Sequence, residues 1–444
     1  MPDITDRIRR EKPEQRQKFI IDLFCKHCSE QMQANPTAWR SKFRKMAASP
    51  FAFYRGSAIL FFSDLADEQD PFHDEKTSRV WIHGDLHAEN FGTYMNSEGV
   101  FVFDVNDFDE SYVGPFTWDL KRLAASLSLL GYQKALSDDE IRQAIAKFTQ
   151  SYVNQVNHFA KNSGDNEFAL TLNNTSGKVL ALLQKTRLNT RIKLLEYWTR
   201  IENYERKITR TSTVSSIDSD TYAKITKAFN NYLETIPPSK RFADYTTYKI
   251  KDIVDTQSLG IGSAGQLTYN ILLEGRTQAL ENDILIFMKP SLAAAPSIAI
   301  TDTGIKNYFL HNAHRTVISQ RALQAHADPW LGYTTINGVG HLVDEASPYK
   351  EDLNWDSINN FGEILEVLGY LGQAVAKIHC VSDDDSDKTL VPFSTEQVIS
   401  DLLKGREEKF VESIVSFGEN YGAIAYEDHR LFVDAFRNRR FPGL

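Results

Sequence analysis

Apolar residues recur every three to four positions along much of the chain, which is the spacing of amphipathic helices. Ser137 precedes Glu140 by three positions, and this capping-box pattern predicts a helix start there. We therefore expect a largely helical protein. The helical segments are 15–48, 118–159, 166–210, 305–327 and 360–380.

Other segments favour strands because they are continuous apolar runs or alternate at period two. The Ser/Thr-rich stretch 210–220 predicts a mobile loop, and strands dominate from Pro237-Pro238 to about residue 290. Together the patterns predict an α+β fold. The expected strands are 51–65, 79–82, 99–105, 267–273, 284–290 and the start of 340–350.

Composition narrows the class of protein. The 444 residues include 42% hydrophobic and 25% charged residues, which is typical of a soluble globular protein with more than one lobe. The net charge of −9 argues against broad nucleic-acid binding but leaves room for a local phosphate pocket. No apolar run is long enough for a membrane span, and the N-terminus carries no secretory signal.

The chain contains three cysteines, which indicates a reducing, cytoplasmic setting. Cys25 and Cys28 lie one helical turn apart, and no second ligand pair is spaced to complete a zinc site. His311 and His314 show a similar helical spacing. We expect all four to be surface or core residues.

The stretch "WIHGDLHAEN" (residues 81–90) sets many polar groups after an apolar strand. Asp85 and Asn90 stand five positions apart, so a tight loop can aim the carboxylate at a substrate hydroxyl and the amide oxygen at a metal. Magnesium prefers oxygen ligands and few protein groups, with phosphates filling the rest. A second carboxylate is therefore needed nearby.

That carboxylate is available in "VFVFDVNDFDE", where Asp104, Asp107 and Asp109 end a predicted strand. An acidic cluster after a strand is usually a hydrated loop. Because it follows the H-x-D-x-x-x-x-N motif closely, the two together predict a magnesium site.

"HGDLHAEN…NDFDESYVGPFTWDL" resembles the catalytic core of the protein-kinase-like superfamily, especially its aminoglycoside and choline phosphotransferase branch. Asp107, Gly114 and Asp119 keep that branch's spacing of metal aspartate, glycine and helix-opening aspartate. "SPFAFYRGSA", "GDLHAENFG" and "NDFDE…GPFTWDLKRLAASL" also resemble DUF2252, a bacterial family of unknown function, and this resemblance covers most of the chain.

The residues before His83 contain no glycine-rich loop, although a kinase-like protein carries its nucleotide lobe there. A G-x-G-x-x-G motif instead follows at 260–265, and the alternation at 267–273 predicts a strand after it, unlike a Rossmann turn. The next strand ends on Lys289, as in a kinase nucleotide lobe. The segment 368–380 resembles the helix that leads into the catalytic loop.

The order of these parts is rotated. We therefore expect a circularly permuted, protein-kinase-like two-lobe fold with a mostly helical large lobe and a small antiparallel-sheet nucleotide lobe. Two unrelated domains with weak motifs are the alternative. The expected domains are 1–245 (N-terminal helices and the catalytic segment, with a catalytic loop at 81–92 and a metal loop at 104–110), 246–350 (nucleotide lobe, with a glycine loop at 259–267) and 351–444 (the helical remainder of the large lobe).

The resemblance implies magnesium-dependent phosphoryl transfer from ATP to a hydroxyl, with Asp85 orienting the acceptor. Asn90 and Asp107 would hold Mg²⁺, and Lys289 would contact the α- and β-phosphates. Backbone amides of the glycine loop would cover the phosphates. The loop residues are Gly260, Gly262, Ser263, Ala264 and Gly265.

Other residues receive supporting roles. His87 is expected at the γ-phosphate, His83 as a brace of the loop, and Asp119 as a helix cap that supports the site. Arg55 is a further candidate for binding an acidic group of substrate or nucleotide. Asp104 and Asp109 are reserve metal ligands.

Two features depart from the kinase pattern. The segment 306–327, which should supply a glutamate to Lys289, has no acidic residue, so the partner is absent or comes from elsewhere. Gly84 replaces the arginine that reads activation-loop phosphorylation in many protein kinases. An adenylyltransferase using the same site and a non-catalytic nucleotide-binding regulator stay open, and the acceptor is either a small molecule or a protein.

Overall fold

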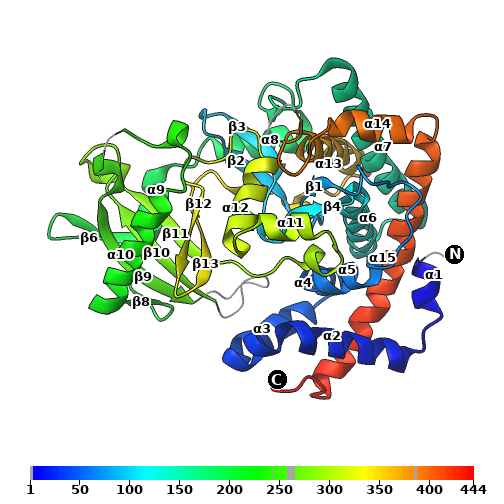
Figure 1. The fold of residues 1–444 in the computed structure, drawn as a ribbon, viewed down its shortest axis with the longest axis horizontal. Coiled ribbons are helices and arrows are strands. Elements are labelled where there is room, and N and C mark those ends of the chain that lie inside the picture. Colours follow the sequence, from blue (N-terminus) through cyan, green and yellow to red (C-terminus); the bar gives the residue numbers. More distant parts are fainter. Residues whose placement is uncertain (1–3, 244, 258–265, 385–387) are drawn as a thin grey trace.

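The chain folds into a helical part and a sheet part that lie next to each other (Figure 1). A computed structural model describes residues 4–243, 245–257, 266–384 and 388–444. The α-helices are α1 (Ile4–Arg9), α2 (Pro13–Ala34), α3 (Pro36–Met46), α4 (Pro50–Gly56), α5 (Ala58–Leu65), α6 (Phe116–Gln133), α7 (Asp138–Asn162), α8 (Gly177–Thr186), α9 (Arg191–Trp198), α10 (Ser219–Leu233), α11 (Thr303–Tyr308), α12 (Asn312–Leu323), α13 (Phe361–Cys380), α14 (Thr395–Leu403) and α15 (Glu407–Arg437).

The strands form antiparallel sheets, so the fold is α+β, as predicted. The largest has the order β12-β13-β11-β10-β9-β8, and a second has the order β14-β2-β3-β5. β1 pairs with β4, and β6 with β7. The strands are β1 (Val80–Ile82), β2 (Phe91–Met95), β3 (Phe101–Val105), β4 (Tyr112–Gly114), β5 (Leu170–Thr171), β6 (Thr199–Glu202), β7 (Glu205–Ile208), β8 (Val214–Ser216), β9 (Ile250–Gln257), β10 (Leu267–Leu273), β11 (Ile284–Pro290), β12 (Gly332–Ile336), β13 (Val339–Glu345) and β14 (Glu351–Asp352).

The six-stranded sheet is buried on both faces in its centre. Ile271 and Leu273 of β10 pack with α10 on one face, and Leu272 packs toward α9 on the other. Alternating strand residues point to opposite faces, so an uninterrupted apolar stretch matches a sheet covered on both sides. This arrangement fixes β11 in the sheet and brings Lys289 to its end.

The helical part is organised around α6, α7, α13 and α15, which share one apolar core. Ser137 and Glu140 form the predicted capping box at the start of α7. The short strands β1 and β4 and the sheet of β2 and β3 lie against this core (Figure 1). The polar segment that follows β1 therefore has a rigid base.

The strand predicted at 51–65 is wrong, because this segment forms α4 and α5. Ser49 caps α4 by accepting a hydrogen bond from the Ala52 N–H, and Pro50 occupies its first turn. A continuous apolar run does not distinguish a strand from a fully buried helix. Ser49 followed by Pro50 is the local sequence pattern that indicates a helix start here.

The helix predicted across 166–210 is only partly right. The segment contains α8 and α9, but β5 precedes these helices and the hairpin of β6 and β7 follows them. In this hairpin Asn203 and Tyr204 adopt positive φ angles of 50° and 62°. Such angles are typical of tight hairpin turns. The predicted loop at 210–220 also contains β8, which adds to the large sheet.

The structural parts do not follow the predicted boundaries at 245 and 350. α10 and β8 precede residue 246 and yet belong to the large sheet and its core. Conversely, residues within 294–323 pack on the core of the helical part. The sheet part therefore includes segments that precede the predicted boundary at 245, and the helical part includes segments from the predicted nucleotide lobe. Position along the sequence alone does not reveal this.

Candidate functional site

The segment after β1 is held by buried hydrogen bonds. The Asp119 carboxylate accepts the His83 N–H at 2.6 Å and the Gly84 N–H at 2.9 Å, and it lies 3.2 Å from His379 of α13. His83 Nε2 lies 2.7 Å from the Asn106 carbonyl oxygen, so the ring ties this loop to the one after β3. Asp119 and His83 support the loop; Pro115, not Asp119, is the N-cap of α6.

Gly84 is required by the close approach of two loops. Its φ is +81°, and a Cβ atom there would lie 2.1 Å from the Glu110 carbonyl oxygen. No larger residue fits at this distance without moving the backbone. The absence of an arginine before Asp85 thus has a steric reason in this fold.

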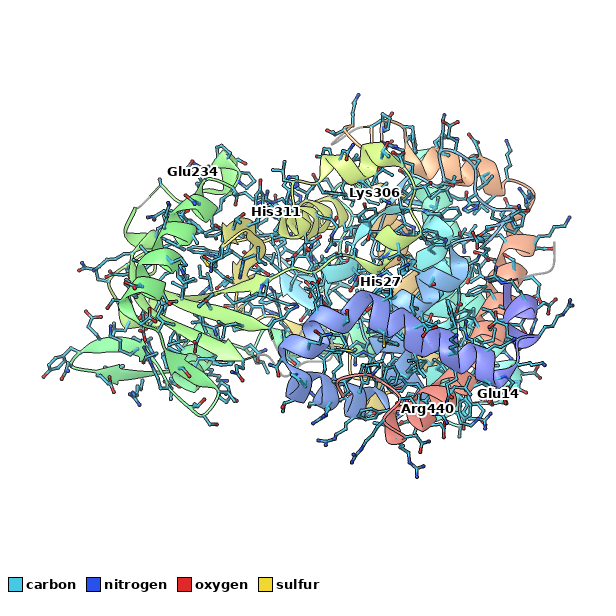
Figure 2. All side chains as sticks on the ribbon, turned by 60° about the horizontal axis from the view of Figure 1, so that its bottom comes forward. Glu14, His27, Glu234, Lys306, His311 and Arg440 are labelled. Carbon is cyan, nitrogen blue, oxygen red and sulfur yellow. The ribbon has the colours of Figure 1, made fainter. Side chains whose placement is uncertain are left out.

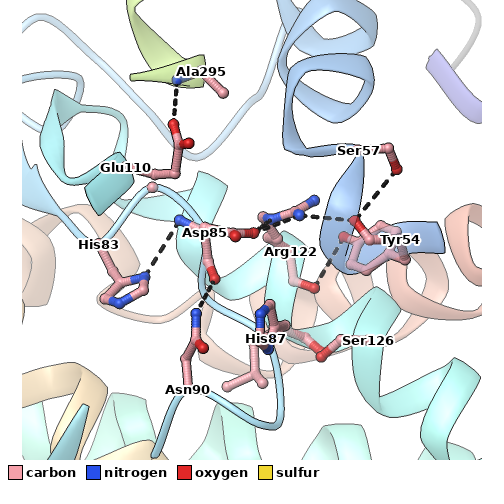
Figure 3. A network of polar contacts seen from close by, with 12 residues as sticks. Tyr54, Ser57, His83, Asp85, His87, Asn90, Glu110, Arg122, Ser126 and Ala295 are labelled. Atoms are coloured by element: carbon pink, nitrogen blue, oxygen red, sulfur yellow. Dashed lines mark hydrogen bonds and ion pairs between the residues drawn. The ribbon is translucent and has the colours of Figure 1, made fainter. Parts of the chain in front are cut away.

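Asp85 forms an ion pair with Arg122, which is fully buried in α6 (Figure 3). The Arg122 Nε–H donates to Asp85 Oδ1 at 2.6 Å, and the second contact also uses Oδ1. Oδ2 is therefore left for another group. Burial raises the pKa of Asp85 to about 7, although the positive charge of Arg122 acts in the opposite direction.

Asn90 and Asp107 carry side-chain oxygen atoms, the kind of ligand atom that Mg²⁺ prefers in proteins. The Asn90 Nδ2–H donates to the Asp85 carbonyl oxygen at 2.9 Å, which leaves the amide oxygen for another partner. Asp107 lies in the loop after β3 and has a left-handed backbone conformation, with φ 60° and ψ 69°. Such a conformation is uncommon for a residue other than glycine. The Asp107 side chain is open to a cleft, but desolvation by the cleft walls and then the charge of Asp109 raise its pKa.

Lys289 finds its acidic partner in Asp109 and not in α12. Burial lowers the pKa of Lys289, but the carboxylates of Asp109 and Asp107 outweigh this effect and raise it. α12 instead supplies the buried Arg315, whose guanidinium donates to the carbonyl oxygens of Asp109 and Ser111, both at 2.7 Å. The helix therefore stabilises the loop that carries the lysine's partner.

These residues line a cavity of about 340 Å³, called here the lysine cleft. Lys289, Asn90, Asp107 and Asp109 all border it, together with Arg55. The structure thus brings Lys289 and Asp107 to one cleft, as the sequence predicts for a shared site.

A second cavity of about 310 Å³, the Asp85 pocket, adjoins the first. Asp85 and Glu110 line it, and Arg55 lines both cavities. Arg55 forms an ion pair with Glu89. Asp85 lines the Asp85 pocket, whereas Asn90 and Asp107 line the lysine cleft.

His87, a predicted site residue, lies in the protein interior. His87 is 2% exposed, its Nδ1 accepts the Glu89 N–H at 3.3 Å, and its ring contacts Phe51. Burial keeps the pKa of His87 well below its usual value. His87 is not included among the described residues that line the two cavities.

Asp104 is 1% exposed and forms an ion pair with Lys377 of α13 inside the protein. It is therefore engaged away from the cleft. The predicted glycine-loop residues Gly260, Gly262, Ser263, Ala264 and Gly265 lie outside the described residues.

The sequence analysis missed Arg122, Glu110 and Arg315. Arg122 follows Asp119 by three positions, so both lie on one face of α6, and this spacing was a usable signal. Nothing local in the sequence marks Arg315 as a partner of the distant loop.

Within the described residues, no group of three or more His, Cys, Asp and Glu side chains is arranged to hold a metal ion. Cys25, Cys28 and Cys380 have free thiols. His311 caps α12 by accepting the His314 N–H at 3.1 Å. No described helix is both long and apolar enough to cross a membrane.

A family model described as "Uncharacterized protein conserved in bacteria (DUF2252)" matches residues 34–435. The chain belongs to the DUF2252 family. No curated protein and no solved structure matches it. The matched range of this DUF2252 member includes all described residues of the lysine cleft.

Proposed function

We propose that this protein is an ATP- and Mg²⁺-dependent phosphotransferase acting on a hydroxyl group. The observation that carries the proposal is the meeting of Asn90, Asp107 and Lys289 in one cleft beside Asp85. These side chains come from segments far apart in sequence. A cation, two oxygen donors and an adjoining carboxylate form the set that phosphoryl transfer requires.

On the donor side, Lys289 binds phosphate oxygens in place of the Asp109 carboxylate. Asn90 and Asp107 would hold Mg²⁺, which when bound supplies positive charge to the phosphates. Arg55 stands between the two cavities, where the transferred group passes. The chain thus contributes positioning and charge rather than a covalent intermediate.

On the acceptor side, Asp85 orients the hydroxyl with Oδ2 and takes its proton. A pKa of about 7 suits this task, because the carboxyl is both available as a base and basic enough near neutral pH. Arg122 fixes the other oxygen and so the direction of the carboxylate.

The same geometry supports a circularly permuted kinase-like fold. The sheet that carries Lys289 follows the loop of Asp85 in sequence, and α13, which comes later still, contacts the support of that loop through His379. Permutation is tolerated where chain ends lie at the surface.

The test is incubation with Mg²⁺ and ATP labelled at either the γ- or the α-phosphate, with cell-extract fractions as acceptors. We expect γ-label in a product, ADP formation, and loss of both with Asp85→Asn. Transfer of α-label would indicate adenylyl transfer. Nucleotide binding without transfer of either label would indicate a regulator and contradict the proposal.

A further inference from the structure

The walls of the Asp85 pocket come mostly from the N-terminal helices and from residues 292–298. Figure 2 labels His27 on the stretch of α2 that borders the pocket. Trp39 and Phe24 give it aromatic surface, and Asp85 and Arg55 also line it. A volume of about 310 Å³ is near the lower end for small-molecule sites, so a small ligand fills it.

Lys42 of α3 is a positively charged residue that lines this pocket. Its ammonium lies 4.6 Å from the centre of the Trp39 ring. Among the described residues no carboxylate lies within ion-pair distance of Lys42, whereas Arg55 is paired with Glu89 and Arg122 with Asp85. Burial lowers the pKa of Lys42, which an anionic ligand would offset.

Polar atoms without partners accompany this lysine. The amide oxygens of Gln31 and Gln266 and the Arg55 Nε–H are buried at the pocket and have no hydrogen-bond partner among the described residues. Buried polar groups are nearly always paired, so such atoms mark places for ligand groups. Amide oxygens match the hydrogen atoms of hydroxyl groups.

We infer that the Asp85 pocket binds a small hydroxylated molecule bearing a carboxylate or phosphate group, with Lys42 holding the anion and Asp85 receiving the hydroxyl. This rests on the proposed function. The acceptor oxygen forms a bond to the γ-phosphorus of ATP, the bond from that phosphorus to the β,γ-bridging oxygen breaks, and ADP leaves. The hydroxyl proton goes to Asp85 Oδ2.

The full chain, Mg²⁺ and γ-labelled ATP are incubated with a bacterial extract divided by ultrafiltration and then by anion exchange. We expect the label in small molecules from the retained, anionic fraction. Label confined to macromolecules, or to small molecules of the unretained fraction, overturns the inference while leaving phosphoryl transfer intact.

Lys42→Met should raise KM for the retained fraction by about 10- to 100-fold, because it removes a charge-assisted contact. Lys42→Arg should recover part of the loss, and stabilisation by Mg-ATP should not change. Lys45→Met is the matched control, an exposed lysine on the same helix. An unchanged KM in Lys42→Met overturns the inference.

A binding measurement separates this inference from the phosphotransferase proposal. If no fraction accepts label, the retained fraction should still raise the melting temperature of the wild type more than that of Lys42→Met. Equal shifts would overturn the pocket assignment itself.

Discussion

The loop that carries Asp85 and the strand end that carries Lys289 border adjoining cavities but are held in different ways. Asp119, fully buried, accepts two backbone N–H groups of the loop, and His83 fixes it again from the other side. Lys289 is held by one ion pair whose Asp109 side chain is 32% exposed.

The difference matters because buried hydrogen bonds to the backbone are costly to break, whereas a partly exposed ion pair exchanges partners at lower cost. The loop of Asp85 is therefore a fixed platform. In the proposed function, the pair of Lys289 and Asp109 opens when phosphate oxygens bind the lysine.

The largest expected effect is on turnover. Asp85→Asn should lower kcat by about 100- to 10,000-fold, because a general base is lost. The Mg-ATP-dependent rise in melting temperature should stay as in the wild type. Loss of nucleotide binding in this variant would mean that Asp85 holds the metal instead.

Next comes the stability of the platform. Asp119→Ala should lower the free energy of unfolding by about 2 to 5 kcal/mol, because it leaves two buried N–H groups without an acceptor. Asp109→Ala, which breaks a partly exposed pair, should cost less than about 1 kcal/mol. Urea denaturation measures both, and equal losses would contradict the contrast.

The exchangeable side is tested by Lys289→Met. Its Kd for Mg-ATP should rise by about 10- to 100-fold, because a charged donor to the phosphates is lost. Lys306→Met, at an exposed lysine of α11, is the control. Calorimetric titration that gives the same Kd for Lys289→Met and the wild type would remove the lysine from the site.

The smallest effect is the dependence on pH. Asp85 must be ionised to act as a base and its pKa is about 7, so kcat/KM should rise about tenfold per pH unit below that value and level off above it. The residual activity of Asp85→Asn should not show this rise. A wild-type profile that is flat across neutral pH would contradict the assigned role.

The sequence predicted the parts of this site that depend on local spacing. Asn90 follows Asp85 at a motif distance, and the alternation in β10 indicated the hairpin whose second strand carries Lys289 next to its last residue. Both patterns report short-range geometry, which a single chain segment determines.

Long-range pairing was not predictable in the same way. Asp109 meets Lys289, and Arg122 meets Asp85, only because helices and sheet pack in this arrangement. The buried surroundings of His87 likewise depend on Phe51 in α4, a segment whose apolar run suggested a strand. Where the predicted secondary structure was wrong, the surroundings of the neighbouring residue were not predictable either.

The central claim is that Asn90, Asp107 and Lys289 bind one magnesium nucleotide. Thermal unfolding tests it most directly, because a ligand that binds only the folded state raises the melting temperature. We expect ATP to stabilise the wild type more with Mg²⁺ than without it, Asp107→Asn to lose most of that increment, and the exposed control Asp401→Asn to keep it. An undiminished magnesium increment in Asp107→Asn would contradict the account.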